Sequence, residues 1–181
     1  MKQALLLIDI QNDYFAGGRS QLHEPLEALA NAEWVLKKFR ESGAPVIHVQ
    51  HISVQDGATF FLPGTDGVKI HERLTPLESE PVVVKHAPSS FLGTNLLELL
   101  QDGNITELVV CGMMSHMCID TTVRACKDHG LKVTLLEDAC ATKDLNFRDT
   151  VIPAETVHRT FMAALSGMFA RVIRTQEYLA E

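Results

Sequence analysis

The sequence contains no apolar stretch that approaches the ~18 consecutive residues that a membrane-spanning helix requires. The apolar residues near the N-terminus, residues 4–8, are too few for a secretory signal, and no small-residue cleavage site follows them. Basic residues are also scarce, because 16 lysines and arginines stand against 23 aspartates and glutamates, a net charge of -7. We therefore expect a cytoplasmic chain that binds neither membranes nor nucleic acid, whose phosphates require a basic surface.

The cysteines show no pairing pattern that indicates a disulfide framework or a metal site. The four are Cys111, Cys118, Cys126 and Cys140, and no two are spaced as CxxC. In a chain of this size, that spacing favours free thiols in a reducing compartment. With 46% hydrophobic and 22% charged residues, the composition is that of an ordinary globular protein. The length predicts one domain over residues 1–181.

Six short apolar runs predict β-strands, and most are continuous, which is typical of parallel strands buried on both faces. They are residues 4–8, 46–49, 82–84, 108–111, 133–136 and 171–173. Helical patterns lie between them, at residues 25–43, 94–100, 115–129 and 153–168. This alternation predicts an α/β fold, a three-layer α/β/α sandwich around a six-stranded, mostly parallel sheet.

One connection, residues 51–81, has no clear periodicity and is long for a compact domain. Connections of this kind are usually binding loops or lids. Its apolar run Phe60-Phe61-Leu62 requires burial on a substrate, on a partner subunit or on the domain itself. Because exposed apolar patches often mark interfaces, we expect a homodimer or a higher homo-oligomer.

Three reactive residues are predicted to share the edge of the sheet where parallel strands end, which is where open α/β sheets bind ligands. Asp9 closes the first predicted strand, Lys85 closes the third, and Cys118 follows the fourth. Taken singly, such residues are usually a turn residue, a surface charge and a small buried side chain. Together they supply the base, the cation and the thiol that acyl transfer to sulfur requires.

Cys118 lies in the segment LVVCGMMSHMCID, residues 108–120. The apolar run ends at Gly112, Ser115 can cap the following helix, and Cys118 then falls in the first helical turn. Free N–H groups and the positive end of the helix dipole favour a thiolate there. The segment therefore predicts a sulfur nucleophile at a strand-to-helix junction.

These motifs resemble those of the isochorismatase-like cysteine hydrolases. The resemblance rests on Asp9 in LLLIDIQNDY, Lys85 in VVVKHAPSSF and Cys118 in VVCGMMSHMCIDTTVRAC, and it extends over residues 5–172. It implies a six-stranded parallel sheet with helices on both faces, and a catalytic triad of Asp9, Lys85 and Cys118. It also implies a cis peptide between Met113 and Met114, with the N–H groups of Met114 and Cys118 forming an oxyanion hole.

The mechanism that the resemblance implies begins with attack of Cys118 on an amide-type carbonyl. Asp9 moves the thiol proton to the leaving amine, and Lys85 keeps Asp9 ionised. The expected protein is a metal-independent hydrolase that needs no cofactor. It cleaves a C–N bond of a small amide, ureide or carbamoyl compound through a thioester intermediate.

Two other activities and a non-catalytic role remain as alternatives. Nicotinamidases of the superfamily hold a metal with an Asp-x-His pair, but here the stretch is Val49-Gln50-His51, and valine cannot bind a metal. We interpret His48 and His51 as surface or pocket-lining residues. Isochorismatases cleave a vinyl ether with an acidic residue, which Cys118 fits poorly. The intact triad argues against a catalytically silent binding protein, and ammonia release would separate amide from ether hydrolysis.

Apolar and histidine side chains near the motifs are candidates for the substrate pocket, although two of the phenylalanines could equally be core residues. The candidates are Phe15, Phe61, Leu62, Phe91, Met114, His116 and Met117. Structural roles in caps, loops and helix surfaces are expected for Asn12, Asp13, Arg124 and Asp138, and a core position for Cys126.

Overall fold

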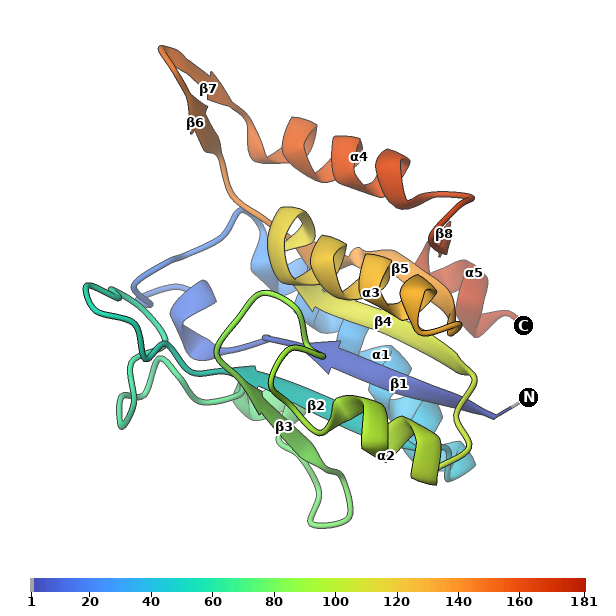
Figure 1. Cartoon of the computed structure of the whole chain (residues 1–181). Coiled ribbons are helices and arrows are strands. Elements are labelled where there is room, and N and C mark those ends of the chain that lie inside the picture. Colours follow the sequence, from blue (N-terminus) through green and yellow to red (C-terminus); the bar gives the residue numbers. More distant parts are fainter. Residues whose placement is uncertain (1) are drawn as a thin grey trace.

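The structure is a computed structural model that describes residues 2–181 (Figure 1). Its main sheet has six strands in the order β3-β2-β1-β4-β5-β8, and every neighbouring pair is parallel. The strands are β1 (Gln3–Ile8), β2 (Val46–His51), β3 (Val82–Lys85), β4 (Glu107–Met113), β5 (Lys132–Ala141) and β8 (Arg171–Ile173). The predicted six-stranded parallel sheet is therefore confirmed.

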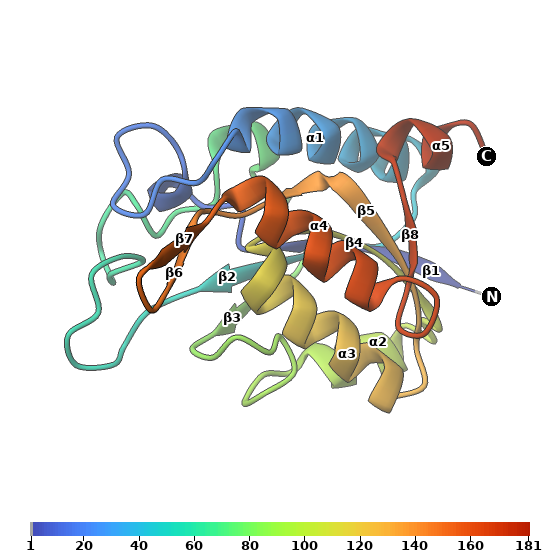
Figure 2. The same ribbon diagram turned by 90° about the horizontal axis from the view of Figure 1, so that it is seen from above.

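Helices cover both faces of the sheet. Helices α1 (Pro25–Ser42) and α5 (Thr175–Leu179) lie on one side, and α2 (Leu96–Asp102) and α3 (Asp120–Asp128) lie on the other (Figure 2). Helix α4 (Ala154–Leu165) packs with α3. Along β1, Leu5 and Leu7 join the core beneath α1, whereas Leu6 and Ile8 join the core beneath α2 and α3. The three-layer α/β/α sandwich is thus confirmed, and no helix within residues 2–181 is long and apolar enough to span a membrane.

The sequence patterns missed a short β-hairpin and a short helix. Strands β6 (Leu145–Phe147) and β7 (Thr150–Ile152) form an antiparallel hairpin that projects from the sandwich (Figure 1). Its turn contains Arg148 with a φ of 53° rather than a glycine or asparagine, so the usual hairpin signal is absent. Helix α5 is only five residues long, too short to show a helical period. In α1, Leu26 is 60% exposed, whereas Leu29, Ala32 and Leu36 are buried.

The predicted helix over residues 115–129 begins with a π-helical turn, Ser115–Ile119, and continues as α3. Ser115 does not cap it, which corrects the expectation from sequence. The hydroxyl of Ser115 lies 2.8 Å from Nδ1 of His158 and 3.3 Å from the carbonyl oxygen of Ala141. The serine therefore ties the turn after β4 to α4 and to the end of β5.

The long connection after β2 folds back onto the domain. Phe61 is 1% exposed, and its N–H donates to Oδ2 of Asp13 over 2.6 Å. Phe60 and Leu62 are half-buried. The apolar run is therefore mainly covered by its own domain, which removes the basis on which we expected self-association. Oligomerisation stays a prediction.

Candidate active site

Three strand ends bring Asp9, Lys85 and Cys118 together. Asp9 follows β1 with a φ of 52°, and its N–H donates to the carbonyl of Val49 on β2 over 3.0 Å. Lys85 is the last residue of β3, and Cys118 lies in the π-helical turn after β4. Asp9 and Lys85 are 0% exposed and Cys118 is 6% exposed. The predicted grouping at the carboxyl edge is therefore present in the structure.

The ammonium of Lys85 is the centre of this group. Its Nζ lies 2.8 Å from Oδ2 of Asp9 and 3.2 Å from Sγ of Cys118. The contact with Asp9 is an ion pair rather than a well-directed hydrogen bond, since neither carboxylate oxygen has a hydrogen-bond partner within residues 2–181. A buried carboxylate without such partners is unusual, and its oxygens remain available to accept a proton.

Burial changes the protonation of all three groups. Burial raises the pKa of Asp9, and the charge of Lys85 opposes that rise. Burial disfavours the charge of Lys85, but Asp9 and Cys118 outweigh it and raise the pKa of the lysine. Burial, followed by the carboxylate of Asp9, raises the pKa of Cys118 despite Lys85. Our expectation that the helix terminus favours a resting thiolate is therefore wrong, because the sulfur is desolvated and keeps its proton beside Asp9.

The turn after β4 carries the two residues expected in the oxyanion hole. The peptide bond between Met113 and Met114 is cis. The carbonyl of Met114 accepts hydrogen bonds from the N–H groups of Met117, over 3.0 Å, and Ile119, over 3.3 Å. These two amides flank that of Cys118 in the sequence. Met114 is 5% exposed and packs in the core on the α1 side of the sheet.

Two aromatic side chains lie close to the triad, and the sequence analysis singled out only one of them. Phe61 lies with its ring centroid 5.9 Å from that of His51 and 4.7 Å, edge to face, from that of Tyr14. Burial, followed by the charges of Asp9 and Cys118, raises the pKa of Tyr14. The signal that could have identified Tyr14 is its position five residues after Asp9, within the same motif.

Other expected pocket residues lie elsewhere. The ring of Phe91 packs at a tilt against that of His129, at the end of α3 remote from Cys118, and the ring of Phe15 packs at a tilt against that of His71. His116 is held by a 2.6 Å contact between its Nδ1 and the hydroxyl of Thr142. Phe15 lies in one core cluster and Phe91 packs against the other, which fits the core role that the sequence left open for both. Leu62 is half-buried and Met117 is 44% exposed.

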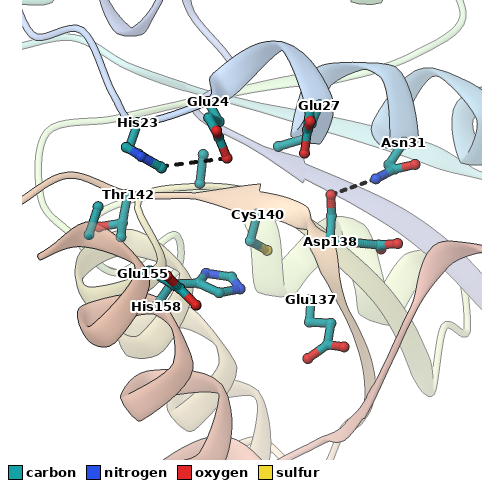
Figure 3. Close-up of a pocket in the computed structure, with 13 residues that line it drawn as sticks. His23, Glu24, Glu27, Asn31, Glu137, Asp138, Cys140, Thr142, Glu155 and His158 are labelled. Carbon is teal, nitrogen blue, oxygen red and sulfur yellow. Dashed lines mark hydrogen bonds and ion pairs between the residues drawn. The ribbon is translucent and has the colours of Figure 1, made fainter.

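Two cavities contain no member of the triad. A cavity of about 360 Å³ lies between the start of α1, the end of β5 and α4 (Figure 3). It is largely acidic, with Glu24, Glu27, Glu137, Asp138 and Glu155 among its lining residues. A cavity of about 880 Å³ is lined by Phe15 and by the loop residues around 17 and 66. Asp9, Lys85 and Cys118 therefore lie outside both cavities.

The residues near the triad do not fit a metal of the nicotinamidase type. Within residues 2–181, three potential ligand atoms of Asp9, His51 and Cys118 lie within 4.8 Å of one another. Nζ of Lys85 contacts all three side chains, so an ammonium stands where these atoms converge. Val49, at the position of the family's carboxylate ligand, is 1% exposed and apolar.

The residues expected to be structural are held in structural contacts. Asp13 accepts from the N–H groups of Arg19 and Phe61, and Asp138 accepts from the N–H and hydroxyl of Thr175. The side chain of Arg124 pairs with Asp120, that of Asn12 donates to the carbonyl of Asp66, and Cys126 is fully buried. His48, on the opposite side of β2 from His51, bonds to Glu80 over 2.9 Å.

Comparisons with known proteins agree with this architecture. Residues 3–177 match the family described as Isochorismatase domain. An uncharacterised isochorismatase family protein of Bacillus subtilis, YddQ, is 54% identical over 179 residues, 99% of each chain. The crystal structure of an isochorismatase hydrolase from Oleispira antarctica has a TM-score of 0.96 and 45% identity, and the match covers 99% of this chain and 97% of that chain.

A more distant structure carries a specific activity in its name. N-carbamoylsarcosine amidase from Thermoplasma acidophilum has a TM-score of 0.82 and 26% identity, and the match covers 97% of each chain. The family match spans nearly the whole chain, and the close relatives share its fold throughout. This chain belongs to the isochorismatase family and is a hydrolase of that family.

Proposed function

We propose that this protein is a cysteine hydrolase that cleaves a C–N bond in a small amide, ureide or carbamoyl compound, without a metal or another cofactor. The observation that carries the proposal is the buried contact of Lys85 with both Asp9 and Cys118. The amidase activity named for the Thermoplasma relative supports C–N cleavage as the reaction class.

In the proposed reaction, the proton of the Cys118 thiol passes to a carboxylate oxygen of Asp9 as sulfur attacks the substrate carbonyl. A raised pKa on Asp9 suits this step, because it makes the carboxylate a better base. Lys85 stabilises the negative charge on sulfur until the S–C bond forms. The N–H groups of Met114 and Cys118 stabilise the oxyanion, each typically worth ~3 kcal/mol.

The second half of the reaction reverses the proton movements. Asp9 delivers its proton to the leaving nitrogen, the C–N bond breaks, and an acyl thioester remains on Cys118. A water that Asp9 deprotonates then attacks the thioester carbonyl, and the C–S bond breaks as Asp9 returns that proton to sulfur, which regenerates the thiol and releases the acid. Each step needs only the carboxylate, the ammonium and the thiol that the site contains.

Ammonia release from a panel of compounds with terminal amide, ureide or carbamoyl groups tests this proposal. We expect release with at least one class, and loss of release in Cys118→Ala. A vinyl ether substrate serves as the alternative arm, since its cleavage releases no nitrogen. Turnover of the ether alone, or turnover that persists in Cys118→Ala, would contradict the proposal.

A further inference from the structure

The side chain of His51 has an unexpected partner. Its Nδ1 lies 2.9 Å from Nζ of Lys85, whereas the sequence favoured a surface or pocket-lining role. The ammonium of Lys85 has three N–H donors, and its three hydrogen bonds go to His51, to the carbonyl of Ala87 at 3.0 Å and to Sγ of Cys118 at 3.2 Å. Because an ammonium is tetrahedral, fixing two of these bonds determines the direction of the third.

We propose that His51 is a positioning residue that, with the carbonyl of Ala87, aims one N–H of Lys85 at the sulfur of Cys118. Without an acceptor at the His51 position, the ammonium is free to rotate. The strongest acceptor within its reach is then the carboxylate of Asp9, whose Oδ2 lies 2.8 Å away but off the hydrogen-bond direction. Because the three N–H groups are fixed at tetrahedral angles, rotation of one towards Asp9 turns the N–H that donates to the sulfur out of line.

The position of His51 is fixed through its backbone. The side-chain amide of Gln11, which is fully buried, accepts from the N–H of His51 over 2.8 Å and donates to its carbonyl over 2.9 Å. The same amide nitrogen also donates to the carbonyl of Val68 over 2.7 Å. The ring of Phe61 packs against the imidazole. The contacts with Gln11 and Phe61 thus hold the end of β2 at the position where the imidazole of His51 contacts Lys85.

The imidazole is also held in the right protonation state. Burial, and then the ammonium of Lys85 and the neighbouring ring of His86, lower the pKa of His51 to about 4. The groups that face it are the carboxylate of Asp9, the ammonium of Lys85, the thiol of Cys118 and the neighbouring ring of His86. At neutral pH, His51 is therefore uncharged, with a proton on Nε2 and a lone pair on Nδ1 directed at the ammonium.

This inference rests on the proposed role of Cys118, but its test needs no substrate. The rate of Cys118 alkylation by iodoacetamide is measured at pH 8.5 by peptide mass mapping in the wild type, His51→Asn, His51→Phe and His51→Leu. Asparagine keeps an acceptor oxygen near the position of Nδ1, whereas phenylalanine and leucine remove it. His86→Gln is the matched control, because His86 is exposed and its ring bonds to the carbonyl of Ile52 rather than to Lys85.

We expect alkylation of Cys118 to fall about tenfold in His51→Phe and His51→Leu, because the thiolate loses an N–H donor. The rate should stay near that of the wild type in His51→Asn and His86→Gln. Leucine opens space around the sulfur, so a slower rate in that variant cannot result from blocked access. Cys140, 7% exposed on β5, provides an internal reference in each digest, and its rate should not change.

Equal or faster alkylation of Cys118 in the phenylalanine and leucine variants would overturn the inference. So would an equal fall in His51→Asn, which would indicate a packing role instead. Circular dichroism confirms that each variant is folded, and the two apolar variants provide independent tests should one not fold. Failure of the ammonia assay would contradict the proposed function but would leave this comparison interpretable.

Discussion

Nζ of Lys85 lies 2.8 Å from Oδ2 of Asp9, and both side chains are completely buried at the carboxyl edge of the sheet. Burial of an ion pair removes two charges from water, and the attraction between them only partly offsets that cost. A fold that retains such a pair next to a thiol uses the charges for more than stability. The pair connects β1 to β3 across β2, so the sheet itself sets the distance between base and cation.

A second buried carboxylate predicts how stability depends on pH. Burial opposes the charge of Glu80, but hydrogen bonds from Arg40, the N–H of Leu77 and His48 outweigh it and lower its pKa to about 2. Because the folded-state pKa lies below the ordinary glutamate value of 4.5, this contribution is present above pH 4.5 and is lost as the pH falls towards 2.

Glu80→Gln should therefore destabilise the protein by about 2 kcal/mol at pH 7, and by less at pH 3. Urea unfolding at the two pH values measures the difference. The matched control is Glu78→Gln, at an exposed position two residues away, which should change the free energy of unfolding little at either pH. A penalty for Glu80→Gln that does not shrink at pH 3 would refute this explanation.

The backbones of β1 and β4 approach so closely at Gly112 that no side chain fits. A Cβ there would lie 2.0 Å from the carbonyl oxygen of Ile8, and the φ of Gly112 is 136°. We expect Gly112→Ala to cost at least about 3 kcal/mol, the upper end of overpacking penalties. Thermal and urea unfolding provide the measurement.

Gly43→Ala separates the two causes of that cost. Gly43 has a φ of 67°, but its added Cβ would meet nothing within 4 Å. Gly43→Ala should lower the free energy of unfolding by about 1 kcal/mol, which is the penalty of a left-handed backbone alone. Similar losses in Gly43→Ala and Gly112→Ala would show that the contact with Ile8 contributes little.

The place of Lys85 in the triad predicts that activity needs no metal. Its ammonium stands where the ligand atoms of Asp9, His51 and Cys118 converge, and a cation there would meet a like charge. Turnover should be unchanged after exhaustive dialysis against EDTA, and added zinc should not raise it. Activity that is lost on dialysis and restored by zinc or iron would revive the nicotinamidase-like alternative.

Self-association is predicted from the sequence, and the structure places the apolar run that motivated it largely inside the domain. Large exposed apolar side chains lie instead on the β6–β7 hairpin, where Phe147 is 63% and Val151 is 57% exposed. Sedimentation equilibrium at micromolar concentration should give a mass that is a multiple of 20.0 kDa. A strict monomer would contradict the prediction.

The strands and the grouping of Asp9, Lys85 and Cys118 could be predicted because each depends on a local pattern. Continuous apolar runs located the six strands of the main sheet, and strand ends located Asp9 and Lys85. The protonation of Cys118 could not be predicted this way, because burial and the carboxylate of Asp9 come from distant parts of the chain. The contact between His51 and Lys85 was missed for the same reason, since it depends on the register of β2 with β3.

Pocket residues were the least predictable part. Phe15 and Phe91 are near the motifs in sequence, but their rings pack at a tilt against those of His71 and His129. Tyr14, which is adjacent to Phe15 in the chain, is the residue whose ring packs on Phe61. The 3₁₀ turn at Asn12–Tyr14 determines which of the two neighbouring aromatic residues faces Asp9 and Cys118. No hydrophobic periodicity in the sequence predicts that turn.

If Cys118 is the nucleophile, it carries an acyl group during turnover, and the mass of the acid-quenched enzyme detects that group. The protein is mixed with a compound that releases ammonia in the panel, quenched during turnover, and digested for peptide mapping. We expect an added acyl mass on the peptide that contains Cys118. Hydroxylamine should remove this mass, and the same peptide of Cys118→Ser should not carry it. An adduct on another residue, or full turnover by Cys118→Ser, would contradict it.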